Sequence, residues 1–197
     1  MTTEELEEKL EGGVETQSVE FKTAHDWDAK LFAKDILALS NVQDGGVIII
    51  GVQEQSADNF VRVGISAEHK KTFKIDGMRD QMTQYADPHV NFTVDFPVDK
   101  GGKEYAVIKV LQFEEIPVIC RKENSIAGTV AGVVYNRNKN RRVESAPVSN
   151  SYDMRDILEL AAVKKMQKMG KLGIVSGQDT LFIPKPEDYL VDELGGL

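Results

Sequence analysis

The stretch Asp44-Gly45-Gly46-Val47-Ile48-Ile49-Ile50-Gly51-Val52 decides the fold of this chain. Residues 47–52 are β-branched apart from Gly51 and carry no charge, which predicts a central strand buried on both faces. The glycine pair before it predicts a tight turn, although glycines also permit the left-handed geometry in which backbone amides surround an anion. We therefore expect a sheet organised around this strand.

Upstream of the central strand, the pattern predicts two helices and another strand. Residues 28–42 carry apolar side chains at helical spacing, namely Leu31, Phe32, Ile36 and Leu39. Residues 18–22 alternate, which predicts a half-buried strand with Glu20 and Lys22 on its polar face. A short acidic helix is expected over residues 3–10.

Downstream of the central strand, helices and strands are mixed. Residues 90–96 alternate, and residues 105–110 form a returning strand after a glycine turn, which predicts a hairpin. Further strands are expected over residues 116–120 and 130–136, and helices over 76–85 and 151–168. The order α-β-α-β-α-β-β-β-β-α predicts an α/β (α+β) fold with a single mixed sheet and flanking helices.

The 197 residues divide by pattern into three segments. Residues 1–12 form an acidic N-terminal helix, and residues 13–168 form the mixed-sheet domain. Residues 169–197 are interrupted by glycine and proline and are too short for a second domain. We expect this C-terminal extension to dock on the domain or to contact a partner protein.

Composition favours a soluble, cytoplasmic protein without a membrane partner. No apolar run approaches the roughly 18 residues that a membrane span needs, and the single cysteine, Cys120, cannot form an internal disulfide. The net charge of -8 opposes nucleic-acid binding unless basic residues are concentrated on one face. Much of the acid lies near the two ends of the chain, which leaves the middle closer to neutral.

Three glutamates, Glu15, Glu20 and Glu54, stand beside predicted strand ends. Converging carboxylates are the usual oxygen ligands of Mg²⁺ or Mn²⁺, which can activate water beside a scissile phosphate. Residues five apart lie on opposite faces of a straight strand, so Glu15 and Glu20 meet only if residues 16–18 bend the chain. The alternative is that Glu20 pairs with Lys22 or a neighbouring strand while Glu15 is solvated.

A basic segment follows Tyr135 near the end of the predicted sheet. Its cations are Arg137, Lys139, Arg141 and Arg142, with asparagines between them. Basic and amide side chains grip phosphates and base edges, and a tyrosine offers a stacking face, which is typical of a single-strand or RNA surface. A solvated loop is the alternative. No P-loop, dinucleotide or zinc-ligand spacing occurs.

Two stretches resemble a known family. They are Val14-Glu15-Thr16-Gln17-Ser18-Val19-Glu20-Phe21-Lys22 and Ala38-Leu39-Ser40-Asn41, followed by the glycine pair and central strand quoted above. The Schlafen AlbA_2 domain family shows a glutamate five residues before Glu-Phe-Lys, a helix ending Ala-x-x-Asn, a Gly-Gly and a strand ending Ile-Gly-Val. The similarity extends more loosely through residues 132–137 and covers about residues 11–165.

The resemblance implies an α/β domain of a family often described as DNA-binding. We expect a partner nucleic acid, with RNA preferred and DNA possible. In the Schlafen branch that cleaves RNA, the first two catalytic acids correspond to Glu15 and Glu20. The third is an aspartate near the end of the Ile-Gly-Val strand, and Gln53-Glu54 occupies that place here, with a glutamate for the aspartate. We therefore expect a metal-dependent endoribonuclease for structured RNA such as transfer RNA, in which Lys22 steadies the phosphate and Mg²⁺ or Mn²⁺ is the cofactor. The animal nucleases pair two such modules, which implies a homo-oligomer here. The alternative is a non-catalytic DNA- or RNA-binding or protein-assembly module of a regulatory or defence system, without a cofactor.

Overall fold

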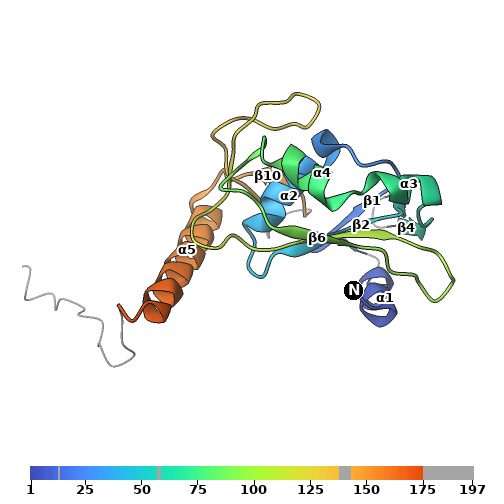
Figure 1. Cartoon of the computed structure of the whole chain (residues 1–197), viewed down its shortest axis with the longest axis horizontal. Helices are drawn as coiled ribbons and strands as arrows, with labels where there is room; N and C mark the ends of the chain where they lie inside the picture. The colour runs from blue at the N-terminus through green and yellow to red at the C-terminus, as the bar shows by residue number, and fades with distance from the viewer. Residues whose placement is uncertain (13, 57–58, 138–142, 175–197) are drawn as a thin grey trace, which may run out of the picture. The chain divides into compact units, whose positions relative to one another are not determined.

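The structure, a computed structural model, describes residues 1–12, 14–56, 59–137 and 143–174. Contacts divide the chain into a unit over Met1–Ala161 and a second over Ala162–Leu197. The first unit holds the sheets and the described residues of the predicted site (Figure 1). The described part of the second unit continues helix α5 (Ser151–Lys171). None of the helices in these residues has the length and apolar composition needed to cross a membrane.

A mixed four-stranded sheet forms the centre of the first unit. Strand β2 (Gly46–Ile50) pairs in parallel with β1 (Val19–Lys22) and antiparallel with β7 (Ala106–Val110), and β6 (Phe92–Asp95) completes the order β1-β2-β7-β6. Ile48, Ile49 and Ile50 are fully buried. The predicted α/β fold with a mixed sheet and a central buried strand is confirmed.

Helices cover both faces of this sheet (Figure 1). Helix α2 (Ala29–Ser40), capped by Asp28, packs on the face that carries Ile48 and Ile50. Helix α1 (Thr3–Glu11) packs Leu6 and Leu10 on the face that carries Val47 and Ile49. The N-terminal helix therefore belongs to the same compact unit as the sheet.

The apolar face predicted for α2 needs one correction. Phe32, Ile36 and Leu39 are buried, but the Leu31 side chain is 47% exposed. Lys30 and Lys34 lie on the same outer side of the helix. Leu31 is therefore available to a ligand.

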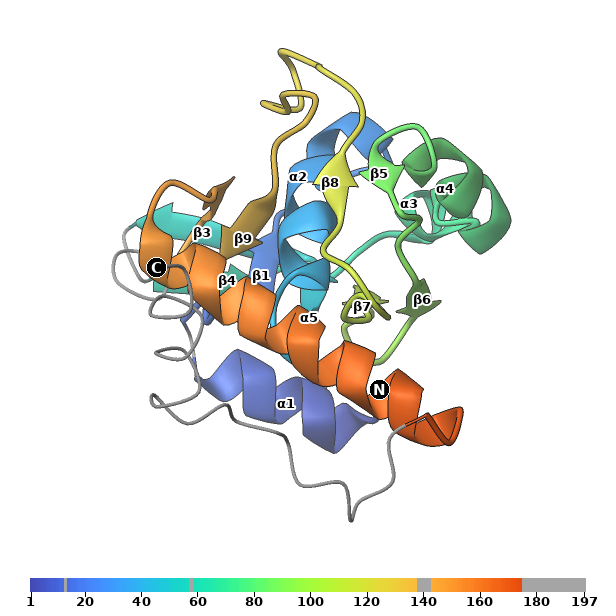
Figure 2. The ribbon, with the colours of Figure 1, turned by 90° about the vertical axis from the view of Figure 1, so that its left-hand side faces the viewer.

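Shorter elements surround the central sheet. Strands β3 (Val52–Ser56) and β4 (Asn59–Arg62) form a hairpin that the sequence patterns did not predict. Gly51, at φ +113°, separates β3 from β2. Helices α3 (Ala67–Thr72) and α4 (Ile75–Met82) follow. The remaining strands are β5 (Ala86–Asp87), β8 (Ile119–Cys120), β9 (Tyr135–Arg137) and β10 (Ser145–Pro147). Strand β9 lies against α2 (Figure 2).

The glycine pair at the start of β2 allows the chain to pack closely against its neighbours. A Cβ atom on Gly46 would lie 2.5 Å from Leu39 Cδ2 and 2.6 Å from the Ser18 carbonyl oxygen. The turn's amides are already engaged, because Asp44 N donates to Gln112 Oε1 and Gly45 N donates to the Val42 carbonyl. The tight-turn interpretation therefore holds, and the amides do not gather around an anion.

Asn41, at the end of the Ala-x-x-Asn stretch, ties α2 to two later segments. Its buried Nδ2 donates to the Val118 and Tyr135 carbonyls at 2.9 Å each, and its Oδ1 accepts from Val118 N at 2.8 Å. This asparagine thereby fixes β9 beside the helix.

Candidate functional site

The three predicted acids line a single open cavity of about 450 Å³, which we call the acid pocket. It lies where β1, α2, β3 and the start of β10 come together. Its charged lining residues are Glu15, Glu20, Lys22, Lys30, Lys34, Asp35, Glu54 and Glu144. The fold thus collects side chains from distant parts of the sequence at one surface.

A bend before β1 brings Glu15 to the pocket. Thr16 N donates to the Val19 carbonyl at 3.1 Å, and Val19 N donates back to the Thr16 carbonyl at 3.2 Å. The chain reverses, and Glu15 Oε1 accepts a hydrogen bond from Phe21 N at 3.1 Å. This is the bend on which the convergence of Glu15 and Glu20 depends.

Arg137, which follows Glu20 by 117 positions in the sequence, stabilises this bend. Its Nη1 donates to Glu20 Oε2, and its Nη2 donates to the Thr16 and Val19 carbonyls at 3.0 and 3.1 Å. The side chain is 0% exposed. The contact with a nucleic-acid strand predicted for Arg137 is therefore wrong for this structure, because its guanidinium is buried and pairs with Glu20.

Lys22 forms a second set of ion pairs with the same glutamate. Its Nζ lies 2.6 Å from Glu20 Oε1 and 2.9 Å from Asp35 Oδ2. Burial disfavours the charged ammonium, but the Asp35 and Glu20 carboxylates outweigh it and raise the pKa of Lys22 above its ordinary value. Lys22 therefore stays cationic at neutral pH. Asp35 was not among the predicted site residues, and its sequence signal is that of an acidic residue inside an otherwise apolar helix.

Glu15 has an altered protonation equilibrium. Burial and the neighbouring Glu20 carboxylate raise the pKa of Glu15 above its ordinary value, against the opposing hydrogen bond from Phe21 N. Glu54 reaches the same pocket from β3, where its backbone is opposite Phe60 of β4. The acids therefore share one pocket, in which Glu20 and Asp35 are paired with cations.

This arrangement does not fit a divalent metal ion. Within the described ranges, no group of three or more His, Cys, Asp or Glu side chains is placed to hold one. Both oxygens of Glu20 are engaged, one by Lys22 and the other by Arg137. No catalytic step through Mg²⁺ or Mn²⁺ follows from this geometry.

The remaining predicted binding residues divide into two groups. Tyr135 is 1% exposed, and its hydroxyl accepts from Val130 N at 2.9 Å and donates to the Gly128 carbonyl at 3.2 Å. The stacking role predicted for its ring requires exposure, so Tyr135 is a core residue instead. Lys139, Arg141 and Arg142 lie outside the described residues.

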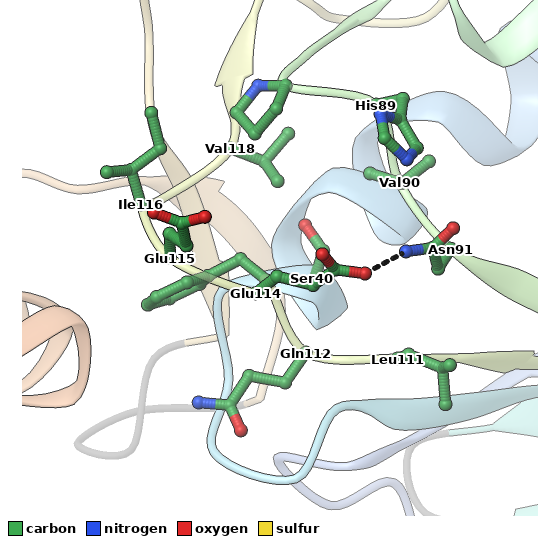
Figure 3. A pocket seen from close by; sticks show the side chains of 12 residues that line it. Ser40, His89, Val90, Asn91, Leu111, Gln112, Glu114, Glu115, Ile116 and Val118 are labelled. Carbon is green, nitrogen blue, oxygen red and sulfur yellow. Dashed lines mark hydrogen bonds between the residues drawn. The ribbon is translucent and has the colours of Figure 1, made fainter. Parts of the chain in front are cut away.

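A second cavity of about 300 Å³ lies elsewhere in the domain (Figure 3). Apolar side chains such as Val90 and Ile116 line it, and Asn91 Nδ2 donates to Glu114 Oε1 at its rim. It contains none of the predicted site residues. The acid pocket is therefore the candidate site.

One comparison with known proteins matches the part of the sequence that forms the acid pocket. A family model described as Schlafen, AlbA_2 matches residues 15–146, an interval that contains every residue lining the acid pocket. A search of curated proteins gave no significant match.

Two solved structures are similar to this chain. The DIP2311 protein from Corynebacterium diphtheriae has a TM-score of 0.45 and 17% identity, over 72% of this chain and 24% of that one. The N-terminal domain of a RecG-related protein from Nitrosomonas europaea has a TM-score of 0.48 and 17% identity, over 77% of this chain and 99% of that domain. The chain thus spans about a quarter of the length of the first protein.

Proposed function

The chain belongs to the Schlafen, AlbA_2 family, and on this premise we propose that it is a nucleic-acid-binding module that uses the acid pocket, with RNA preferred over DNA. The observation that carries the proposal is the convergence of Lys22 with Glu15, Glu20 and Glu54 in one pocket. Lys22 keeps a positive charge in the pocket between Glu20 and Asp35, and the carboxylates supply acceptors for base amino groups. A pocket of about 450 Å³ is within the range of small-ligand sites and suits a single nucleotide unit.

Local charge matters more than net charge in this proposal. A chain with a net charge of -8 repels a phosphate backbone at long range. Binding therefore depends on the lysines at the pocket and on the basic segment at Lys139, Arg141 and Arg142. We expect affinity to fall steeply as salt is added, because each phosphate contact releases counterions.

A metal-dependent endoribonuclease acting on structured RNA such as transfer RNA is the second candidate. The observation that favours it is that Glu15, Glu20 and Glu54, the acids implied by the family resemblance, line the same pocket. Cleavage would require Glu20 to leave at least one of its two cationic partners. A non-catalytic binding or assembly module in a regulatory or defence system needs no such change. Self-association and a partner for residues 169–197 stay predictions.

The test is a binding and cleavage series on the full chain. Fluorescently labelled single-stranded RNA, transfer RNA and single-stranded DNA are titrated by anisotropy at several salt concentrations. The same nucleic acids are then incubated with Mn²⁺ or with a chelator, and the products are separated on a denaturing gel. Wild type is compared with Glu15→Gln, which keeps an acceptor for Phe21 N, and with Glu20→Gln.

The outcomes separate the candidates. Binding that weakens with salt, without new products, supports the binding module. Products that form with Mn²⁺, disappear with chelator and are lost in Glu15→Gln support the nuclease, provided that the variant is at least as stable as wild type. Failure of wild type to bind any of the three nucleic acids at low salt contradicts the proposed function.

A further inference from the structure

The mouth of the acid pocket carries two lysines that the site does not otherwise use. Lys30 and Lys34 are four residues apart on α2, so they lie on the same side of the helix with roughly 5–6 Å between their Cβ atoms. Neither has an ion-pair partner in the part of the chain that the structure describes. Lys22, by contrast, is held by Glu20 and Asp35.

Two exposed apolar side chains lie at the same mouth. Leu31, between the two lysines in sequence, is 47% exposed, and Ile126 is 69% exposed. They come from α2 and from the loop between β8 and β9. Apolar side chains beside cations provide a surface for the flat face of a base next to a site for its phosphates.

Most of the other charged side chains that line the pocket have the opposite character. They are the carboxylates of Glu15, Glu20, Asp35, Glu54 and Glu144, and ionised carboxylates only accept hydrogen bonds. A phosphate is repelled by this group of carboxylates. An exocyclic amino group is attracted to it, because acidic side chains accept from the amino group of cytosine.

We propose that Lys30 and Lys34 bind successive phosphates of a single strand while an unpaired base carrying an exocyclic amino group points into the acid pocket. This inference rests on the proposed function and adds to it the residues, the strandedness and the base class. A double helix is excluded from the pocket by its paired and stacked bases. Leu31 and Ile126 contact the base or its neighbour at the rim.

The first test measures the two lysines against a charge-matched control. Lys30→Gln with Lys34→Gln is compared with Lys74→Gln with Lys109→Gln, two exposed lysines that do not line the acid pocket. Binding of a labelled 12-nucleotide RNA is followed by anisotropy from 25 to 200 mM salt, chosen as roughly the range in which phosphate contacts dominate. The pocket variant should bind about tenfold more weakly and lose about 1.4 from the slope of log K against log salt.

The second test measures the base preference. Oligocytidine and oligouridine of the same length carry equal charge, and cytosine has an exocyclic amino group where uracil has a carbonyl oxygen. Wild type should bind oligocytidine about fivefold or more tightly than oligouridine. Ile126→Ser should weaken both complexes without changing the salt slope, because it removes an apolar contact and no charge.

Each failure has a separate meaning. Equal losses in the two lysine pairs would overturn the role of Lys30 and Lys34 while leaving binding itself in place. Equal affinity for the two oligomers would overturn the base assignment. No binding by wild type at 25 mM salt would overturn the proposed function and, with it, this inference.

Discussion

Arg137 Nη1 donates to Glu20 Oε2 across 117 positions of the sequence, and this pair is buried beneath the acid pocket. The same guanidinium donates to the Thr16 and Val19 carbonyls through Nη2. One side chain therefore fixes both the second acid and the bend that delivers Glu15. Because Arg137 is 0% exposed, its role is to position the pocket and not to touch a ligand.

Replacing Arg137 should be among the most damaging single changes in the domain. Arg137→Gln leaves Glu20 buried without its guanidinium partner, and breaking a buried ion pair costs about 3–5 kcal/mol. Urea unfolding should show this loss in the free energy of unfolding. Arg121→Gln is the matched control, since Arg121 is exposed, and it should stay within about 0.5 kcal/mol of wild type. Equal effects of the two changes would contradict the positioning role.

Lys22 and Asp35 should be energetically coupled. A double-mutant cycle with Lys22→Met and Asp35→Asn should give a coupling energy of roughly 0.5–3 kcal/mol, since their charged atoms lie 2.9 Å apart. The folded-state pKa of Lys22 is raised, so its contribution to stability is complete below the pKa of an unfolded lysine and is lost as pH rises through the folded value. Additive effects at pH 7 would show that the pair is not coupled.

Glu15 should destabilise the folded chain when it is ionised. Its pKa is raised in the folded state, so ionised Glu15 lowers the free energy of unfolding at pH values above that raised pKa. This loss disappears as pH falls below the unfolded pKa of about 4.3. Glu15→Gln should therefore raise the free energy of unfolding at pH 7 by on the order of 0.5 kcal/mol, with no gain near pH 3.5. Thermal melts of both proteins across this pH range measure it. A gain that is independent of pH would point to a cause other than charge.

Two glycine substitutions should have opposite signs. Gly46→Ala places a Cβ atom 2.5 Å from Leu39 Cδ2 and 2.6 Å from the Ser18 carbonyl, so overpacking should cost about 1–3 kcal/mol. Gly77→Ala, inside α4, meets nothing within 4 Å and should stabilise by up to about 1 kcal/mol through helix propensity. Melting temperatures of the two variants test the pair. A tolerated Gly46→Ala would contradict the close packing of the turn.

The parts of the fold that have strong local patterns were predictable. The β-branched run of β2, the helical spacing of α2, the alternation of β6 and the apolar run of β7 each reflect burial of one or both faces. The hairpin of β3 and β4 was not, because Gln53-Glu54-Gln55-Ser56 is exposed and shows no apolar alternation. A sequence pattern for a strand arises from burial of one of its faces, and residues 53–56 are not buried.

The gathering of three glutamates in one pocket could be predicted from the sequence, but only part of their pairing could. Glu15, Glu20 and Glu54 came from their places beside strand ends and from the family motif. The pairing of Glu20 with Lys22 was foreseen as an alternative. The pairing of Glu20 with Arg137 was not, because it spans 117 positions and leaves no local pattern. Tyr135 and Arg137 were assigned to a surface that binds a nucleic-acid strand, because they adjoin a basic run. Strand β9 places both residues in the core. Spacing alone does not report which side of a short strand is covered.

The most direct test of nucleic-acid binding at the acid pocket is a titration of the isotopically labelled full chain with an unlabelled single-stranded oligocytidine, followed by amide chemical shifts. Binding at the acid pocket predicts shifts at Lys22, Leu31 and Lys34 that saturate together. Unchanged shifts at these residues, or saturating shifts confined to the apolar cavity around Val90 and Ile116, would contradict it.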